Sequence, residues 1–92
     1  MFTYTLVRTS FSKTSPNREL GVSDNFNEMI TAFKIAQNAL IATNYGVQVE
    51  AVEDMVGGTD YLLEMGDLMN HAASLNIRKQ IRKLEAELAD LV

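Results

Sequence analysis

Residues 23–51 read SDNFNEMITAFKIAQNALIATNYGVQVEA and pass from one hydrophobic period to another. The first part places apolar side chains at steps of three and four residues, which predicts an amphipathic helix. Ser23 or Asp24 is expected to cap this helix. The last part alternates apolar and polar residues from Val47 to Ala51, which predicts a half-buried strand directly after the helix. The helix stripe expected to face the core is Phe26, Met29, Ile30, Phe33, Ala36 and Leu40.

The segments on either side of this stretch predict further strands. Residues 2–11 are rich in aromatic and β-branched side chains, which favours a strand. Residues 12–23 contain turn-forming residues and are expected to be a loop. Gly57 and Gly58 suit a tight hairpin, after which residues 59–65 are expected to return as a third strand. A helix carrying Val49, Val52 and Val56 on one face is the alternative for the middle of the chain.

A second helix is expected from Gly66–Asp67 onward, with an apolar face made of Leu68, Met69, Ala72 and Leu75. That face is out of phase with the apolar repeat that begins at Ile77. The polar residues Ser74 and Asn70 lie three and seven residues before Ile77, where the repeat would require apolar residues, so a kink or break is expected around residues 74–76.

The element order expected from these patterns is β-α-β-β-α, which belongs to the α+β class. We expect a small antiparallel three-stranded sheet with a packed helix and a helical C-terminal appendage. Residues 1–92 should form a single domain, with its core in residues 1–66 and the helical segment in residues 67–92.

The composition is that of a folded globular chain, with 92 residues, 47% hydrophobic residues and a net charge of −4. The absence of cysteine excludes disulfides, thiolate metal sites and cysteine nucleophiles. No basic region precedes an apolar core at the N-terminus, and no apolar run approaches the roughly 18 residues of a membrane span. We therefore expect a cytoplasmic protein without a membrane partner.

No motif in the chain carries a recognisable chemistry. Gly57–Gly58 lacks the elements of a phosphate-binding loop and is interpreted as a turn. The single histidine, His71, follows Asp67 and Glu64 at turn-like spacing, but this spacing matches no metal signature and favours a histidine on a solvated face. Paired carboxylates could act as an acid–base pair without a sequence signature. We expect no enzyme activity, no metal and no cofactor.

Charge is segregated along the chain, because no Lys or Arg occurs between Lys34 and Arg78. The segment 50–67, here called the acidic segment, suits a basic protein groove. A basic cluster of four residues follows it and suits nucleic acid or an acidic surface. The acidic segment carries Glu50, Glu53, Asp54, Asp60, Glu64 and Asp67, and the basic cluster is Arg78, Lys79, Arg82 and Lys83.

The C-terminal repeat combines this basic cluster with an apolar seam and a following run of acidic residues. Cations near the start of a helix and anions near its end oppose the helix dipole, and Arg78 with Arg82 is a like-charged pair one turn apart. Three readings stay open: antiparallel pairing with a second copy, a bound phosphate backbone, and local pairing of the basic residues with Glu85 and Glu87. The possible dimer seam is Ile77, Ile81, Leu84, Leu88 and Leu91.

The chain resembles the small phage-encoded anti-CRISPR proteins that act on type I RNA-guided surveillance complexes. The resemblance lies in size, acidic balance and a β-α-β-β core that begins with MFTYTLVRTSF and continues through SDNFNEMITAFKIAQNAL and YGVQVEAVEDMVGGTDYLLEM. It implies a non-enzymatic inhibitor in the host bacterial cytoplasm that binds the multi-subunit protein–RNA complex and blocks hybridisation of target DNA. The acidic segment would then face the basic channel, and the basic cluster would contact the guide RNA.

Two hypotheses of other classes accompany this one. The first is a homodimeric structural or regulatory protein, joined through its C-terminal helices. The second is a small nucleic-acid-binding regulator, whose binding would depend steeply on salt through the basic cluster.

Overall fold

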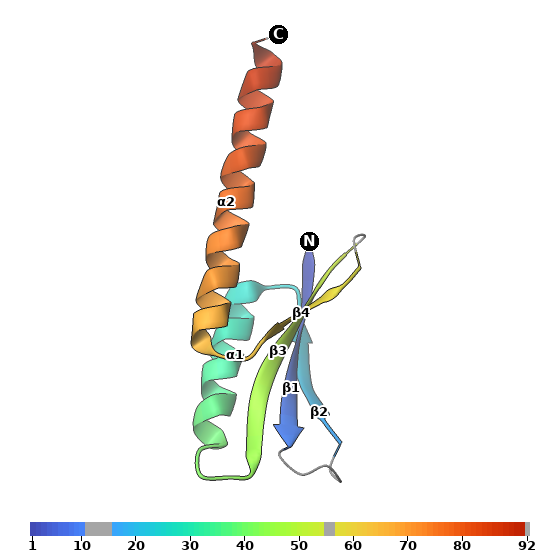
Figure 1. Cartoon of the computed structure of the whole chain (residues 1–92), viewed down its shortest axis with the longest axis vertical. Coiled ribbons are helices and arrows are strands. Elements are labelled where there is room, and N and C mark those ends of the chain that lie inside the picture. The colour runs from blue at the N-terminus through green and yellow to red at the C-terminus, as the bar shows by residue number, and fades with distance from the viewer. Residues whose placement is uncertain (11–15, 55–56, 92) are drawn as a thin grey trace.

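The computed structural model describes residues 1–10, 16–54 and 57–91. It contains a four-stranded antiparallel sheet and two helices, which confirms the α+β class (Figure 1). The sheet order is β2-β1-β3-β4. The strands are β1 (Phe2–Ser10), β2 (Arg18–Ser23), β3 (Tyr45–Glu53) and β4 (Thr59–Leu62), and the helices are α1 (Phe26–Ala39) and α2 (Met65–Asp90).

Strand β2 is one strand more than the sequence predicted, and it occupies part of the expected loop. It pairs with β1, and the register shifts once along the pair. Leu6 lies opposite Gly21 and Val7 lies opposite Glu19, so Leu20 has no residue opposite it on β1. Leu20 and Val22 are both exposed. A short edge strand with a bulge and no buried face lacks the alternation by which strands are predicted.

The predicted first helix is confirmed, with its N-cap one residue later than Ser23 or Asp24. The Asn25 side chain accepts a hydrogen bond from the Glu28 amide at 3.2 Å. Met29 and Phe33 of this helix are fully buried against the sheet. The helix ends at Ala39, and Ala42 takes a left-handed φ of 63° in the turn that leads to β3.

The predicted hairpin is present, because Gly57 and Gly58 have φ angles of 74° and 85° and β3 pairs with β4. The strand interpretation of Val49 and Val52 is therefore correct for these two residues, while Val56 lies outside the described part. Strand β4 ends at Leu62, three residues earlier than expected. Glu64 is the N-cap of α2, and Met65 begins that helix.

The core lies between one face of the sheet and the two helices. Phe2, Tyr4 and Leu6 point inward from β1, Val49 and Ala51 from β3, and Leu62 from β4. The start of α2 closes this core with Leu68, which is completely buried. The rest of α2 rises beyond the sheet as a free rod (Figure 1), and the molecule measures 59 × 23 × 17 Å.

The kink expected at residues 74–76 is absent, because α2 is one helix of 26 residues. The apolar side chains do change phase after Leu75, but the backbone does not break there. The helix continues through residues 74–76 and changes the face on which its apolar side chains lie. A helix needs no break for this, since its backbone hydrogen bonds do not depend on which face is buried.

Candidate helix-docking surface

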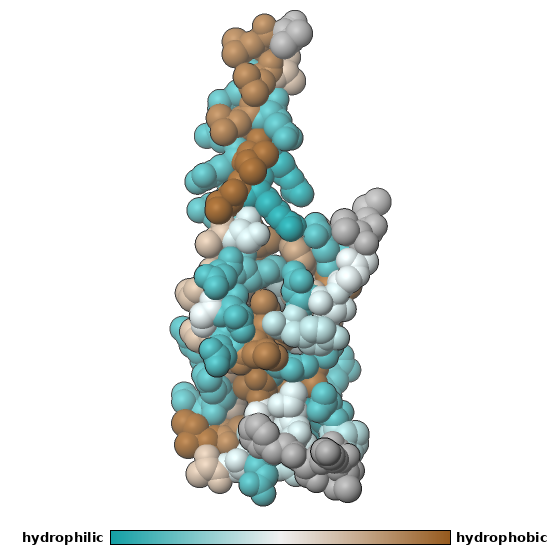
Figure 2. Space-filling model, in the orientation of Figure 1, coloured by the Kyte–Doolittle hydropathy of each residue, from teal (hydrophilic) through white to brown (hydrophobic). Residues whose placement is uncertain are grey.

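The distal half of α2 together with its C-cap, residues 77–91, carries an apolar stripe that is exposed. This part of the chain is called the distal half below. All five residues of the predicted seam are exposed, by 48% to 83% of their surface. Figure 2 shows these apolar side chains running along the rod between hydrophilic neighbours. We call this surface the distal stripe: Ile77, Ile81, Leu84, Leu88 and Leu91.

The distal stripe faces away from its own domain. In the first half of α2, Leu68, His71 and Leu75 pack against the core. At about 100° of rotation per residue, the distal stripe is centred roughly 150° around the helix from these three side chains. The stripe therefore cannot reach the sheet by tilting or sliding of the helix. In the part of the chain that the structure describes, all five side chains of the stripe are exposed.

Most of the basic cluster lies away from the distal stripe. At about 100° of rotation per residue, Lys79 and Arg82 are roughly 140–160° around the helix from the centre of the stripe, and Arg78 is roughly 100° from it. Arg78 Nη1 lies 3.2 Å from both carboxylate oxygens of Glu53 at the end of β3. Its guanidinium carbon is 5.7 Å from the centre of the Phe2 ring. Lys79 and Arg82 continue this face along the helix, and Lys83 lies outside it beside Leu84. The structure thus brings three of the four predicted basic residues together.

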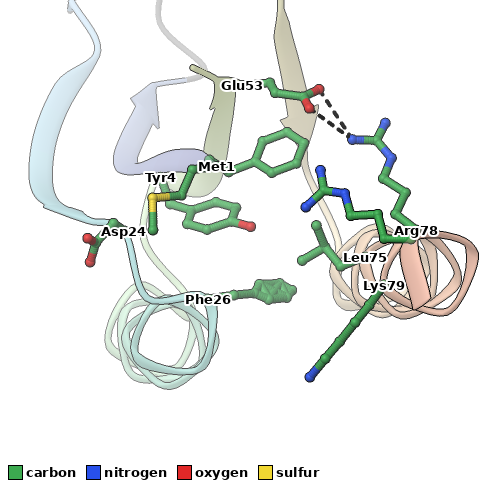
Figure 3. Close-up of a pocket in the computed structure, with 10 residues that line it drawn as sticks. Met1, Tyr4, Asp24, Phe26, Glu53, Leu75, Arg78 and Lys79 are labelled. Atoms are coloured by element: carbon green, nitrogen blue, oxygen red, sulfur yellow. Dashed lines mark hydrogen bonds and ion pairs between the residues drawn. The ribbon is translucent and has the colours of Figure 1, made fainter. Parts of the chain in front are cut away.

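These three basic residues line a pocket of about 440 Å³ between β1, the start of α1 and the middle of α2. Figure 3 shows Tyr4 and Phe26 on the domain side of this space and Leu75, Arg78 and Lys79 on the helix side. Asp24 and Glu53 also line it, so the pocket has both signs of charge. No local sequence pattern indicates this pocket, because its walls come from four separate elements.

Local pairing of the basic cluster is absent from the part of the chain that the structure describes. The ion pair there is Arg78 with Glu53, and none joins Arg82 to Glu85 or Lys83 to Glu87. Apart from Arg78, the cations and anions of the distal half that the structure describes form no ion pair.

The acidic segment does not form one surface. Asp60 pairs with the buried Ala51 and so lies on the core face of the sheet, whereas Glu50 lies on the other face.

Several carboxylates of the segment also have structural roles. Asp67 accepts hydrogen bonds from the backbone amides of Leu63 and Glu64 at 3.0 and 3.1 Å, which stabilises the start of α2. Glu53 is bound to Arg78.

Two further carboxylates of the segment receive hydrogen bonds from neighbouring side chains. Asp54 accepts one from the Thr3 hydroxyl at 3.2 Å, and Glu50 accepts one from the Gln48 amide at 3.3 Å. The exposed Asp60 lines a shallow pocket beside His71 on the flank of α2. The predicted acidic patch is therefore divided over several parts of the molecule.

His71 is buried, so the prediction of a solvated face is wrong. Its Nε2 and the Tyr4 hydroxyl oxygen are 2.8 Å apart and share a hydrogen bond. The rings of Phe2, Tyr4 and Phe26 surround the imidazole at centroid distances of 4.7 to 5.5 Å. Burial lowers the pKa of His71, with a further lowering by Arg78 and an opposing effect of Asp60 and Glu53. Burial also raises the pKa of Tyr4 to about 12.

The environment of His71 indicates a packing role. Within the described ranges, no group of three histidine or acidic side chains is arranged to hold a metal ion. The helices in those ranges also lack the combination of length and apolar character that a membrane span requires.

Comparison with known proteins gives no relative for this chain: no protein family, curated protein or solved structure matches it.

Proposed function

We propose that this protein is a non-enzymatic interaction protein and that two copies associate through the distal halves of α2. The observation that carries the proposal is the orientation of the distal stripe, which faces away from the domain that bears it. Apolar positions with a regular spacing of three and four residues suit a second helix. The acidic end of the same rod complements its basic beginning, so a second copy offers both the apolar face and the opposite charges.

The size of the distal stripe indicates association of moderate strength. Fully burying one Leu or Ile side chain is worth about 1.5–3 kcal/mol, but these residues are only 48% to 83% exposed, so less than the full value is gained. Association itself costs about 4–15 kcal/mol in lost freedom of motion. With four or five such side chains in each copy, we expect a dissociation constant on the order of micromolar.

The experiment that tests this proposal is the measurement of molar mass as a function of concentration. The protein should change from monomer to dimer over roughly 1–200 µM in sedimentation equilibrium. Leu84→Asp puts a charge into the middle of the distal stripe and should keep the chain monomeric. Ala89→Asp is the matched control, because it introduces the same charge on the same helix but outside the stripe.

Comparison of the wild type with the two variants distinguishes a dimer from a monomer. Dimerisation of the wild type and of Ala89→Asp, with a monomeric Leu84→Asp, would support the proposal. A wild type that stays monomeric at 200 µM, well above the expected range, would overturn it. Circular dichroism of all three proteins at low concentration checks that each is folded.

A second candidate is the inhibitor of a type I RNA-guided surveillance complex. It is favoured by the position of Arg78, Lys79 and Arg82, which share one exposed face of the rod and could bind the backbone of a guide RNA. The acidic segment would then contact the basic channel of the complex. In this proposal the protein acts by occupying the channel and excludes target DNA.

The distribution of the acidic side chains determines how this candidate is tested. Glu50 and Asp60 can be reversed to Lys without removing the helix cap or the ion pair of Glu53. Because the strand register places Glu50 and Asp60 on opposite faces of the sheet, Glu50→Lys and Asp60→Lys are prepared separately. Binding of a purified surveillance complex should be lost in one of these two variants and retained in Glu19→Lys, which changes an exposed carboxylate on β2. Equal binding by all variants would rule out the acidic contact. Binding to free guide RNA alone, with steep salt dependence, would favour a nucleic-acid-binding regulator.

A further inference from the structure

We infer that the two α2 helices pair antiparallel in a single register, in which Ile77 packs against Leu88 of the partner subunit. This inference rests on the proposed self-association and specifies its geometry. Ile81 then packs against Leu84 of the partner subunit, and the two-fold symmetry repeats both contacts. Four apolar layers result, and the dimer axis crosses the helices between residues 82 and 83.

The heptad positions of the distal stripe restrict the possible alignments. The spacing assigns Ile81 and Leu88 to a positions, and Ile77, Leu84 and Leu91 to d positions. Antiparallel helices place a residues opposite d residues. Two alignments fill four layers with apolar side chains: one pairs residue 77 with 88 and 81 with 84, and the other pairs 81 with 91 and 84 with 88.

The charges beside the seam favour the first of these alignments. At the flanking e position it places Arg78 beside Glu85 of the partner subunit, and the two-fold axis repeats this contact along the same edge of the seam. The second alignment instead places Glu85 beside the partner's Glu85 and Glu87 beside the partner's Glu87. Like charges at such positions are destabilising, whereas opposite charges select the partner and its orientation.

Parallel pairing is disfavoured by the same criterion, although it offers five apolar layers. It sets the basic clusters of the two chains at one level and the residues Glu85, Glu87 and Asp90 at another. In that arrangement Gln80 lies beside Glu85 of the partner subunit, and this flanking contact contains no ion pair because Gln80 is neutral. Because α2 begins at Met65, the basic cluster lies in the middle of the helix, away from the terminal turns on which the helix dipole acts. Among these alignments, the first antiparallel register is the one that places an opposite charge beside Glu85.

Arg78 can serve both its own domain and the partner. It gives only Nη1 to Glu53, while a guanidinium carries five N–H donors. Its side chain is 48% exposed. Arg82 and Lys83 occupy outer positions of the heptad and remain in solvent.

The shape of the molecule permits this arrangement. The distal half of α2 extends beyond the sheet and beyond α1 (Figure 1), so the two folded bodies would lie at opposite ends of the paired rods. The shared layers cover residues 77–88, or about 17 Å of helix.

Disulfide trapping in the full chain tests the register without interference, because the natural sequence has no cysteine. We would prepare Ile77→Cys and Leu88→Cys as separate chains with tags of different size, mix them, and oxidise them in a glutathione buffer. The proposed register brings residue 77 opposite residue 88, while two copies of residue 77 lie about 16 Å apart along the axis. Disulfides require Cα atoms within roughly 7 Å.

The expected product is the mixed disulfide, at least about tenfold above either disulfide between identical chains. Ala89→Cys, which lies off the seam, measures the background of random oxidation. Disulfides between two copies of Ile77→Cys would overturn the inference and indicate parallel pairing. Preferred trapping of Leu84→Cys with Leu88→Cys would overturn it in favour of the second antiparallel alignment.

Failure of the register and failure of self-association give different results. If the chain does not associate, the wild type remains a monomer in sedimentation and every cysteine pair reacts at the background level. If it associates in another geometry, the wild type is a dimer and a different cysteine pair is trapped.

Discussion

At the scale of single residues, the buried hydrogen bond between Tyr4 and His71 ties α2 to the centre of the sheet. Tyr4 is on the central strand β1 and His71 is two turns into α2, 67 positions later in the chain. Each group satisfies the other inside an otherwise apolar cluster of rings. Their burial without a partner would be costly, since an unsatisfied polar group loses its hydration without compensation.

Tyr4→Phe should therefore destabilise the fold. The change keeps the ring but leaves His71 Nε2 buried without its partner, which costs about 1–3 kcal/mol of unfolding free energy. Urea denaturation followed by circular dichroism measures this loss. Tyr61→Phe is the control, because Tyr61 is exposed and its hydroxyl can be replaced with little effect. Equal stability of the two variants would show that the hydrogen bond contributes nothing.

Stability should also depend on pH through His71. Its pKa in the folded protein is lowered by burial, so the unfolded chain takes up a proton at a higher pH than the folded chain does. The stability contributed by neutral His71 is present above about pH 6.5 and is lost as the pH falls toward the lower folded pKa. Urea denaturation at several pH values between 5 and 7.5 measures the slope. His71→Gln keeps a hydrogen-bonding group without this titration.

The pH experiment compares slopes rather than absolute stabilities. The wild type should lose stability more steeply than His71→Gln as the pH decreases, because all other titrating groups are shared. Parallel slopes for the two proteins would contradict the assignment of the pH effect to His71.

At the scale of elements, α2 is one helix with two apolar faces that serve different purposes. Its first half uses Leu68 to close the core, and its distal half exposes Leu84 on the opposite side. An isolated helix of this length is marginal in water, so pairing of the distal halves would also stabilise their helical conformation.

Truncation of leucines on the two faces should change the unfolding free energy by very different amounts. Leu68→Ala removes a completely buried side chain and should lower the unfolding free energy by about 2–5 kcal/mol. Leu84→Ala should change it by less than about 0.5 kcal/mol at concentrations where the chain is monomeric. Thermal and urea denaturation at low protein concentration measure both values. A large loss in Leu84→Ala under these conditions would mean that the distal stripe packs on its own domain.

The edge strand β2 shows how pairing can override a weak local pattern. Its residues carry the turn signals Gly21 and, just before the strand, Pro16 and Asn17. Strand β1 nevertheless pairs with these residues. One edge of β1 is hydrogen-bonded to β3, and β2 supplies the partner for the other edge. The bulge opposite Leu6 and Val7 absorbs the mismatch.

At the scale of the whole molecule, the rod makes the chain unusually extended for its length. The radius of gyration is 16.3 Å, whereas a compact domain of this size has a value of about 12 Å. The difference arises from the distal half of α2, which contributes length without adding to the core. This shape leaves the distal stripe exposed among the residues that the structure describes.

Small-angle X-ray scattering should distinguish the dimer geometries by their length. The antiparallel dimer shares about 26 Å of helix between residues 74 and 91, so its maximum dimension should be roughly 90 Å. A parallel dimer should remain close to the 59 Å of one chain. Scattering from concentrated wild type and from Leu84→Asp provides the comparison. A dimer no longer than the monomer would contradict the antiparallel arrangement.

The candidate site was accessible to sequence reasoning only in part. The spacing from Ile77 to Leu91 predicts the distal stripe, because helical periodicity is a local property of the chain. The pocket beneath Arg78 could not be predicted, since Phe2, Phe26 and Leu75 meet there only through tertiary packing. The placement of Glu53 beside Arg78 likewise depends on how α2 lies against β3.

The sequence by itself determined the elements whose signals are local: helix α1 with its buried Met29 and Phe33, the glycine hairpin after β3, and the periodic seam near the C-terminus. Each follows from hydrophobic period or from backbone freedom within a few residues. Only the tertiary structure decided that β2 joins the sheet, that His71 is buried, and that α2 stays continuous while its apolar face changes side. These features depend on contacts between residues that are far apart in the sequence. Such contacts are selected by the free energy of the whole folded chain, which no short segment contains.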